Sequence, residues 1–387
     1  MPPSPAQIAH RIARAARPLV TIDPPPAGVH ADWDVPVPMP DGVTLRANVF
    51  RPPATEAGER VPVIMCAHPY GKDRIPAKRR GRGVDPQYRA LPQPGPVRIS
   101  AWTGWEGPDP AAWVPRGYAV VNLDLRGSGS SEGVGELLSR REAEDYAEAI
   151  AWAAAQPWST GRVGLLGVSY LALAQYGVAA LRPPALAAIC PWEGFSDVYR
   201  DFARPGGIHE TGFLRLWSTV TRRTSRLAED LGAQVAARPT RDEWYRAHTP
   251  DLAAIEAPML VCGSFSDHDL HTRGSFEAFR RAGSERRWLH THRGGKWERF
   301  YSGEALATQA RFLDWALKGE DNGWDAEPPV RLAIHEDGAA PAEVRHEAAW
   351  PPDDLTWEEL PLDIASRSLR PAGDTPDRSS ILLDTRG

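Results

Sequence analysis

The segment from Arg162 to Tyr176 constrains the fold of this chain more strongly than any other stretch. Apolar residues and glycine run from Val163 to Gly167, and an Ala- and Leu-rich stretch with helical spacing follows. Ser169 lies at the turn between the two parts. The order of strand, sharp turn and helix predicts that Ser169 is a nucleophile at the carboxyl edge of a sheet, with the backbone N–H of Tyr170 directed at a developing oxyanion. The alternative role of this serine is that of an ordinary helix N-cap.

Composition and charge indicate a globular protein and exclude several classes of partner. With 387 residues, 42% of them hydrophobic, the chain can bury one large core and carry a smaller attachment. The net charge of −5 comes from interspersed acidic and basic residues, so we expect no nucleic-acid partner. No run of about 18 apolar residues occurs and the start lacks a secretory signal, so we expect no membrane partner and a cytoplasmic location. Cys66, Cys190 and Cys262 end separate apolar runs, which fits packing in a reducing compartment.

Strand and helix patterns alternate along most of the chain, which predicts an α/β fold. A β-hairpin is expected at 32–38 and 43–51 around a Met-Pro-Asp-Gly turn. Continuous apolar runs predict buried strands at 61–67, 118–124, 185–190, 258–263, 287–292 and 330–335. Amphipathic stretches predict helices at 141–155, 274–282 and 304–318. The alternation indicates a mostly parallel sheet with helices on both faces.

We expect four segments in this organisation. The core occupies 1–194 and 251–320, a helical cap is inserted at 195–250, and 321–387 is a β-rich C-terminal segment that we interpret as truncated. The long loop at 72–113 is rich in Arg, Pro and Gly, and we expect it to fold over the mouth of the site. It would bring Trp102 or Trp105 to the substrate, and surface packing is the alternative for both. His209 in the cap either reaches the pocket or lies on the cap surface.

The elbow at 167–171, Gly-Val-Ser-Tyr-Leu, resembles that of the CocE/NonD hydrolases, the family of cocaine esterase and X-Pro dipeptidyl-peptidase. Other segments match the same family in the same order, and they are 40–43, 68–73, 113–118, 199–201 with 205–207, and 270–275. Several separated motifs in one order are hard to obtain by chance. The resemblance implies an α/β-hydrolase fold with a helical cap and a C-terminal β-sandwich, and cleavage of acyl esters or amides.

The resemblance also implies roles for individual residues. It assigns the acid to Asp267, whose alternative role is to cap the next turn. Asp124 and Asp197 also follow strands and are weaker candidates. Tyr70 matches the family tyrosine whose phenol donates to the oxyanion beside the Tyr170 N–H, and its alternative role is to pack against the cap. The order of a serine, an aspartate and a later base agrees with α/β-hydrolases.

The general base departs from the family pattern. An ungapped alignment after the strand at 287–292 places Lys296 where the family has its histidine. An amine has an ordinary pKa of about 10.4, and a neighbouring Asp267 would stabilise its charged form, so Lys296 would accept a proton poorly. Three interpretations follow. His292 swings into the site, Lys296 acts as the base with Asp267 turned away, or the chain is a pseudoenzyme that binds acyl compounds without turnover. Hydrolysis or acyl transfer is the preferred interpretation.

No cofactor is expected, because acyl transfer by serine needs neither redox chemistry nor a metal. His268 and His271 are three residues apart and His290 and His292 alternate on a strand, but no companion residue completes a metal-binding spacing. The expected partner is a small-molecule acyl ester or amide. A truncated β module would leave apolar surface, which a second copy of the chain could cover in a homo-oligomer.

Overall fold

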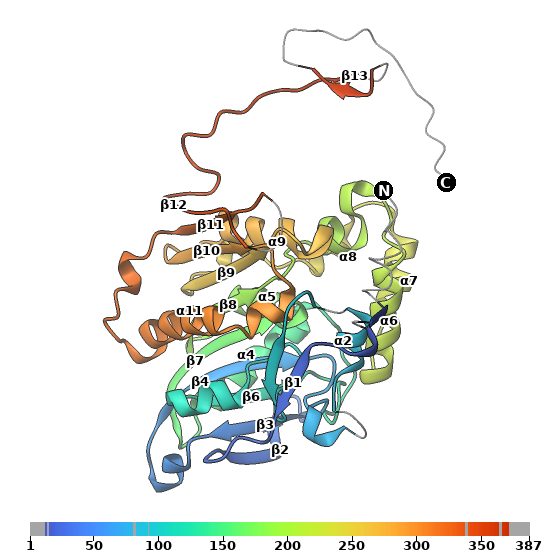
Figure 1. Ribbon diagram of the computed structural model, residues 1–387. Coiled ribbons are helices and arrows are strands. Elements are labelled where there is room, and N and C mark those ends of the chain that lie inside the picture. Colours follow the sequence, from blue (N-terminus) through green and yellow to red (C-terminus); the bar gives the residue numbers. More distant parts are fainter. Residues whose placement is uncertain are drawn as a thin grey trace.

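The computed structural model describes residues 12–13, 15–79, 83–91, 93–336, 340–363 and 366–370. Its main sheet is built from the strands β2 (His30–Pro38), β3 (Thr44–Arg51), β4 (Val61–His68), β6 (Ala119–Asp124), β7 (Ser159–Val168), β8 (Leu186–Trp192), β9 (Met259–Ser264), β10 (Arg287–His292), β11 (Val330–Ile334) and β12 (Glu343–Glu347). Within the described residues these ten strands have the order β12-β11-β10-β9-β8-β7-β4-β6-β3-β2 (Figure 1).

The interior of this sheet is parallel and its edges are antiparallel. Neighbouring strands run parallel from β6 through β4, β7, β8, β9 and β10 to β11. At one edge β3 pairs antiparallel with β6 and β2 with β3, and at the other β12 pairs antiparallel with β11. The expected hairpin, the buried strands and the α/β-hydrolase fold class are confirmed.

Helices cover both faces of the sheet. They are α2 (Pro86–Ala90), α3 (Pro110–Trp113), α4 (Arg140–Ala154), α5 (Tyr170–Ala179), α6 (Phe213–Thr224), α7 (Leu231–Ala237), α8 (Glu243–Ala247), α9 (His268–Arg281), α10 (Lys296–Phe300) and α11 (Gly303–Leu313). Shorter helical turns are η1 (Pro53–Ala57), η2 (Pro76–Lys78), η3 (Val114–Arg116), η4 (Val198–Ala203), η5 (Pro205–Gly207), η6 (Leu252–Ala254), η7 (Asp314–Lys318) and η8 (Trp324–Ala326).

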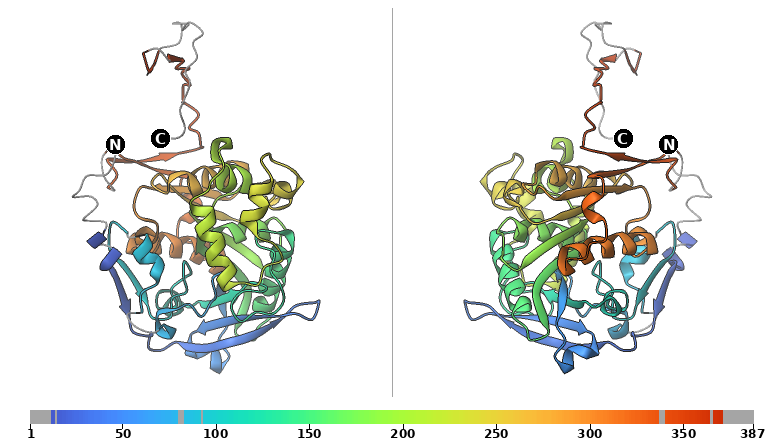
Figure 2. Two further views of the ribbon diagram at one scale, coloured as in Figure 1. Left: turned by 90° about the vertical axis from the view of Figure 1, so that its right-hand side faces the viewer. Right: turned by 90° about the vertical axis from the view of Figure 1, so that its left-hand side faces the viewer.

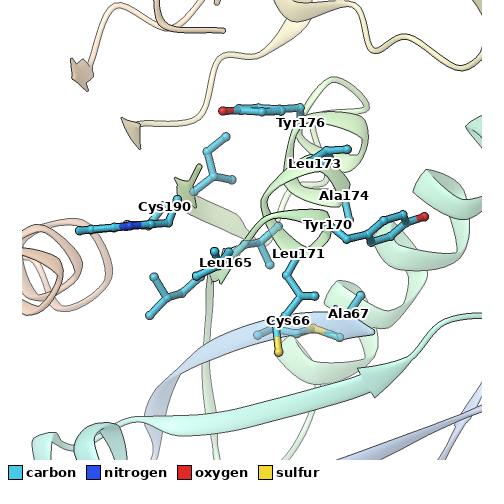
Figure 3. Close-up of a cluster of buried hydrophobic side chains, with 14 of the residues drawn as sticks. Cys66, Ala67, Leu165, Tyr170, Leu171, Leu173, Ala174, Tyr176 and Cys190 are labelled. Atoms are coloured by element: carbon cyan, nitrogen blue, oxygen red, sulfur yellow. The ribbon is translucent and has the colours of Figure 1, made fainter. Parts of the chain in front are cut away.

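Strand β7 is covered closely on both faces because two of its positions are glycine. A Cβ atom at Gly164 would lie 2.9 Å from a methyl group of Leu317 in η7, and a Cβ atom at Gly167 would lie 2.5 Å from that of Leu171 in α5. Side chains alternate between faces along a strand, so these two contacts lie on opposite faces. Helix α5 is therefore buried on nearly all sides, and Figure 3 shows its side chains among those of β4, β7 and β8.

The helices α6, α7 and α8 lie between β8 and β9 in the sequence and form a cap on one side of the core (Figure 2). Helix α6 is amphipathic and turns Leu214, Trp217 and Thr221 inward. Ser128 and Ser225 hydrogen-bond each other at 2.7 Å, which ties the end of α6 to the loop after β6. The cap is thereby fixed over the carboxyl ends of the core strands.

The terminal regions add small elements. Strands β1 (Val20–Asp23) and β5 (Val97–Ser100) form a separate parallel pair, so the loop at 72–113 contains regular structure that was not expected. In the C-terminal segment β12 extends the main sheet, whereas β13 (Leu362–Asp363) and β14 (Ser368–Leu369) pair away from it (Figure 1). No helix among the described residues is long and apolar enough to cross a membrane.

Candidate active site

The parallel strands bring polar side chains to one edge of the sheet. Tyr70 follows β4, Ser169 follows β7, Glu193 follows β8, Asp267 follows β9 and Lys296 follows β10. Because the carboxyl ends of neighbouring parallel strands meet at the same edge, these residues converge, as open α/β sheets generally arrange their ligand sites.

Ser169 lies on a strained turn between β7 and α5. Its backbone has φ 58° and ψ −120°, a conformation that residues other than glycine rarely adopt. The turn is held by a hydrogen bond from the Ser169 N–H to the Trp192 carbonyl at 3.1 Å, while the Ser169 side chain makes no cap bond. The role of an ordinary N-cap is therefore excluded. Tyr170 begins α5, so its N–H has no partner within the helix.

The Ser169 hydroxyl meets a histidine that was not among the expected bases. Ser169 Oγ lies 3.3 Å from His271 Nε2, and His271 Nδ1 is hydrogen-bonded to the Asp267 carboxylate. The Asp267 contact fixes the proton on Nδ1, which leaves Nε2 free to accept the serine proton. The three side chains form a connected serine, imidazole and carboxylate arrangement of the kind that activates a hydroxyl.

His271 reaches this position because α9 begins earlier than expected. The sequence predicts a helix from residue 274, but α9 begins at His268 with Asp267 at its N-cap position. Residues four apart lie on the same face of a helix, so Asp267 and His271 stand one above the other. The ring of Phe195 stacks on the imidazole with an interplanar angle of 14°, which holds its orientation.

A glycine lets α9 approach the segment after β8. A Cβ atom at Gly274 would lie 2.5 Å from the Cα of Phe195 and 2.5 Å from the backbone N of Ser196. Arg273 beside it pairs with the buried Asp201, with Nε 2.7 Å from Oδ1. Asp201 in turn accepts hydrogen bonds from the backbone of the same segment. The helix that carries His271 therefore packs directly against the backbone of this segment.

Gly274→Ala should push α9 outward and displace His271 from Ser169. We expect the free energy of unfolding to fall by about 1–3 kcal/mol from overpacking, and kcat to fall by about tenfold or more from the misplaced base. Gly303→Ala is the matched control, because a Cβ atom there meets nothing within 4 Å. Urea unfolding, and the kinetics of p-nitrophenyl ester hydrolysis as the activity that the family resemblance implies, measure the effect on both variants. Equal behaviour of the two variants would show that α9 docking does not position the base.

The two expected bases have other partners. His292 Nε2 lies 3.0 Å from Glu193 Oε1, and its ring stacks on Trp192. His292 is therefore a buried strand-end residue in this structure, and His271 rather than His292 lies within reach of Ser169. Lys296 Nζ lies 3.0 Å from Asp267 Oδ1 and 3.1 Å from His271 Nδ1. Lys296 thus stands behind the imidazole, on the side away from the serine.

The charges in this cluster favour an ionised acid and a neutral base. Burial acts to raise the pKa of Asp267, but Lys296 and His271 outweigh it and hold that pKa well below its ordinary value. Burial, and then the charge of Lys296, lower the pKa of His271. Burial acts to lower the pKa of Lys296, but Asp267 and the nearby Glu193 and Glu106 raise it. Lys296 is therefore a persistent cation and a poor proton acceptor.

Tyr70, the expected second oxyanion donor, has a hydroxyl that can still donate. Trp217 Nε1–H donates to the Tyr70 hydroxyl oxygen at 3.0 Å, which leaves the Tyr70 O–H available as a donor. Burial raises the pKa of Tyr70 far above its ordinary value, so the phenol keeps its proton. Tyr70 lines the same cavity as Ser169. Its ring also contacts Tyr170 edge to face at 6.2 Å, so it packs against the elbow as well.

The side chain of Tyr170 anchors the elbow from the opposite direction. Its hydroxyl donates to Glu142 Oε2 at 2.5 Å, and the Leu138 N–H approaches the same carboxylate oxygen at 3.3 Å. Burial outweighs these hydrogen bonds and raises the pKa of Glu142 to about 8. The folded chain therefore binds this proton more tightly than the unfolded chain, whose carboxyl has the ordinary value near 4.5.

Glu142→Gln should change how stability depends on pH. The protonated Glu142 contributes its full stabilisation below about pH 4.5, and that contribution is lost as the pH rises toward about 8. We expect the free energy of unfolding of the wild type to fall by about 3 kcal/mol relative to Glu142→Gln between about pH 5.5 and about pH 8. Urea titrations at both pH values measure this, with the half-exposed Glu144→Gln on the same helix as control. Parallel pH profiles of wild type and Glu142→Gln would contradict it.

A cavity of about 580 Å³ opens in front of Ser169. Its lining is mainly aromatic and aliphatic, and the apolar residues include Tyr70, Phe202, Phe213, Trp217, Val220, Leu270 and Trp297. Charged residues on its wall are Arg74, Glu106, Asp201, Glu210, Asp267 and Lys296. The loop at 72–113 contributes Gln87, Leu91 and Glu106, so it does border the site as expected.

Three expected substrate-binding residues lie away from this cavity. Trp102 stacks on Phe50 of β3 at 5.5 Å and contacts Trp33 of β2 edge to face, so it lies at the hairpin edge of the sheet. Trp105 is buried against Tyr88 and Trp297. His209 is half-buried in the cap, whose neighbouring Glu210 lines the cavity instead. Trp297, which packs on Trp105, lines the cavity.

The two weaker candidates for the acid, Asp124 and Asp197, have structural roles. Asp124 is buried, accepts from the backbone of Lys72 and Ser130, and pairs with the buried Lys72 ammonium at 3.7 Å. Asp197 caps η4 through the N–H groups of Tyr199 and Arg200. Among the described residues, no group of three or more His, Cys, Asp and Glu side chains is arranged to hold a metal ion.

Comparison with known proteins gives consistent matches. The family model described as X-Pro dipeptidyl-peptidase (S15 family) matches residues 41–297. The cocaine esterase of a Rhodococcus species is 32% identical over 194 residues, which are 48% of this chain and 28% of that protein. A crystal structure of a CocE/NonD family hydrolase from Staphylococcus aureus is 39% identical with a TM-score of 0.79, and covers 88% of this chain and 60% of that one. The chain therefore spans less than two thirds of the length of these relatives.

Proposed function

Since the chain belongs to the X-Pro dipeptidyl-peptidase S15 family, we propose that it is a serine hydrolase of esters or amides with Ser169 as nucleophile and His271 as general base. The observation that carries the proposal is the connected arrangement of Ser169, His271 and Asp267 at the base of a cavity. The hydroxyl faces the imidazole, the imidazole faces the carboxylate, and the serine lies on a strained elbow. These features fit activation of the Ser169 hydroxyl. An imidazole within reach of the serine replaces the interpretations that relied on Lys296 or His292.

In the first half of the reaction the Ser169 oxygen attacks the substrate carbonyl carbon while its proton moves to His271 Nε2. The carbonyl oxygen becomes an oxyanion, and we assign its stabilisation to the Tyr170 N–H and the Tyr70 O–H. Asp267 stabilises the imidazolium that forms. The carbonyl then reforms, the bond to the leaving alcohol or amine breaks, and His271 returns the proton to the leaving oxygen or nitrogen.

In the second half a water molecule replaces the leaving group. His271 takes a proton from the water as its oxygen attacks the acyl carbon, and the same two donors hold the second oxyanion. The bond from the acyl carbon to Ser169 then breaks, and the proton passes from His271 to the serine oxygen. The products are a carboxylic acid and a regenerated enzyme. An alcohol or amine in place of water would give acyl transfer, the related reaction that the sequence also suggested.

The cavity favours an apolar acyl group of moderate size. Its volume of about 580 Å³ lies within the range of small-molecule sites. Phe213, Val220 and Trp217 of α6 and Leu270 of α9 face it, so apolar surface of the substrate would be buried next to Ser169. We propose small esters or amides with an aliphatic or aromatic acyl group as the substrate class.

A panel of chromogenic substrates tests this function. p-Nitrophenyl esters from acetate to octanoate and benzoate, together with X-Pro p-nitroanilides, would be offered to the wild type and to Ser169→Ala. The proposal requires turnover of at least one apolar ester that depends on Ser169. Tight binding of the same compounds without any Ser169-dependent release of nitrophenol or nitroaniline would make the chain a pseudoenzyme and overturn the proposal.

A further inference from the structure

Lys296 occupies an unusual place, because a lysine ammonium lies directly behind the imidazole of the candidate base. Its Nζ is 3.0 Å from Asp267 Oδ1 and 3.1 Å from His271 Nδ1, and its side chain is 14% exposed. Asp267 thus has one carboxylate oxygen on His271 and the other on Lys296. Although Asp267 lies at the N-cap of α9, its side chain makes no cap bond, and its second carboxylate oxygen pairs with Lys296.

Lys296 is itself held by the surrounding protein. It begins α10, and the next residue, Trp297, donates from its indole to Glu106 Oε1 at 3.1 Å. Glu106 and Glu193 both act on Lys296 through their charges, and Glu193 is also paired with His292. The ammonium therefore contacts Asp267 directly and also interacts with the charges of Glu106 and Glu193.

From these contacts we propose that Lys296 is a positioning residue, which holds Asp267 ionised and aligned and keeps His271 in its neutral, proton-accepting form. The inference rests on the proposed function, because it assigns Lys296 a role in the same site. Lys296 does not touch the reacting atoms. It acts through Asp267 and His271, and it occupies the position at which the resemblance led us to expect the base itself.

The electrostatic consequence has a definite sign. The groups that face His271 are Asp267, which favours the imidazolium, Lys296, which opposes it, and Glu193, which favours it more weakly. Removing the ammonium takes away the opposing charge, so the pKa of His271 should rise. A base is active only when unprotonated, so the acid limb of the rate profile should move to higher pH.

The test compares Lys296→Met with Lys296→Arg and with the wild type. We expect the acid limb of kcat/KM for a p-nitrophenyl ester to move up by about one pH unit or more in Lys296→Met. Arg keeps the charge, so Lys296→Arg should retain a limb near that of the wild type. Lys78→Met is the control, because Lys78 pairs with Asp73 and lies over the Trp33 ring on the outer face of the chain. A purely structural role would lower kcat/KM at every pH without moving the limb, and that result would overturn the inference.

A second measurement separates this inference from the proposed function. The His271 imidazole is titrated by NMR through its Cε1–H signal, assigned by its loss in His271→Gln, with Ser169→Ala as the background. The pKa should be higher with Lys296→Met than with Lys296, and this readout needs no turnover. An unchanged His271 pKa would contradict the role of Lys296 even if the enzyme is active. A shifted pKa in a chain that hydrolyses none of the tested substrates would remove the proposed function and leave the electrostatic role standing.

Discussion

Replacing His271 with alanine should lower kcat for ester hydrolysis by roughly 10⁴-fold or more. The reason is that Ser169 Oγ then has no acceptor for its proton, since its hydrogen-bond partner in the described structure is His271 Nε2. The loss should match that of Ser169→Ala within about tenfold, because residues that act as one unit do not contribute additively. Steady-state kinetics with the best ester of the panel measures both variants.

His292→Gln is the informative comparison for that experiment. His292 pairs with Glu193 and stacks on Trp192, so its replacement should reduce stability and change kcat by less than about tenfold. Circular dichroism and a thermal melt confirm that each variant is folded before its rate is compared. The opposite ranking, with His271→Ala active and His292→Gln inactive, would mean that the base moves into the site from the β10 loop.

Replacing Tyr70 with phenylalanine should lower kcat by about 10²- to 10³-fold, the usual cost of one oxyanion donor. KM should change little, because the donor meets its acceptor fully only as the carbonyl oxygen gains charge. The Trp217 indole would also lose its acceptor, the Tyr70 oxygen, so a small loss of stability should accompany the loss of rate.

Tyr176→Phe supplies a matched control for Tyr70→Phe. It makes the same chemical change at a buried tyrosine of α5, and the Tyr176 hydroxyl has no hydrogen-bond partner among the described residues. We expect a kcat within about threefold of the wild type. A Tyr70→Phe variant as active as Tyr176→Phe would remove Tyr70 from the oxyanion site and leave it as a packing residue against the elbow.

The strands and the elbow could be predicted from sequence because their signals are local. The apolar runs that became β4, β9 and β10 end within one residue of their observed limits. Ser169 needs only its own strand, turn and helix to be recognised. Parallel neighbours then place Tyr70 and Asp267 at the same edge, a consequence of topology rather than of any one side chain.

The base could not be predicted, because it depended on where one helix begins. Residues 268–273 contain two histidines, three residues with β-branched or charged side chains and no strong N-cap pattern beyond Asp267, so the helix was expected only from Gly274. The available signal was the spacing of Asp267 and His271, which are four apart as helix neighbours require. From sequence, His271 has only a weak hypothesis as a metal ligand. The ungapped family alignment places Lys296 at the position of the base.

The positions of Trp102 and Trp105 could not be predicted for a similar reason. Trp102 and Trp105 lie in a loop whose path depends on β5, which pairs with β1 from the N-terminal region, a long-range pairing without a local signature. That pairing carries Trp102 to Phe50 and packs Trp105 behind Trp297. Trp297 and the cap residue Trp217 line the cavity instead. A tryptophan in a loop indicates that its side chain is buried, but the sequence does not identify the residues it packs against.

Reaction with a fluorophosphonate probe, followed by peptide mass spectrometry, tests most directly whether Ser169 is a hydroxyl activated by His271. We expect a single adduct on the peptide that contains Ser169, no adduct in Ser169→Ala, and labelling of His271→Ala slower by at least about 10²-fold. Absence of an adduct on the wild type at high probe concentration, or labelling of Ser169 at the same rate with and without His271, would contradict the account.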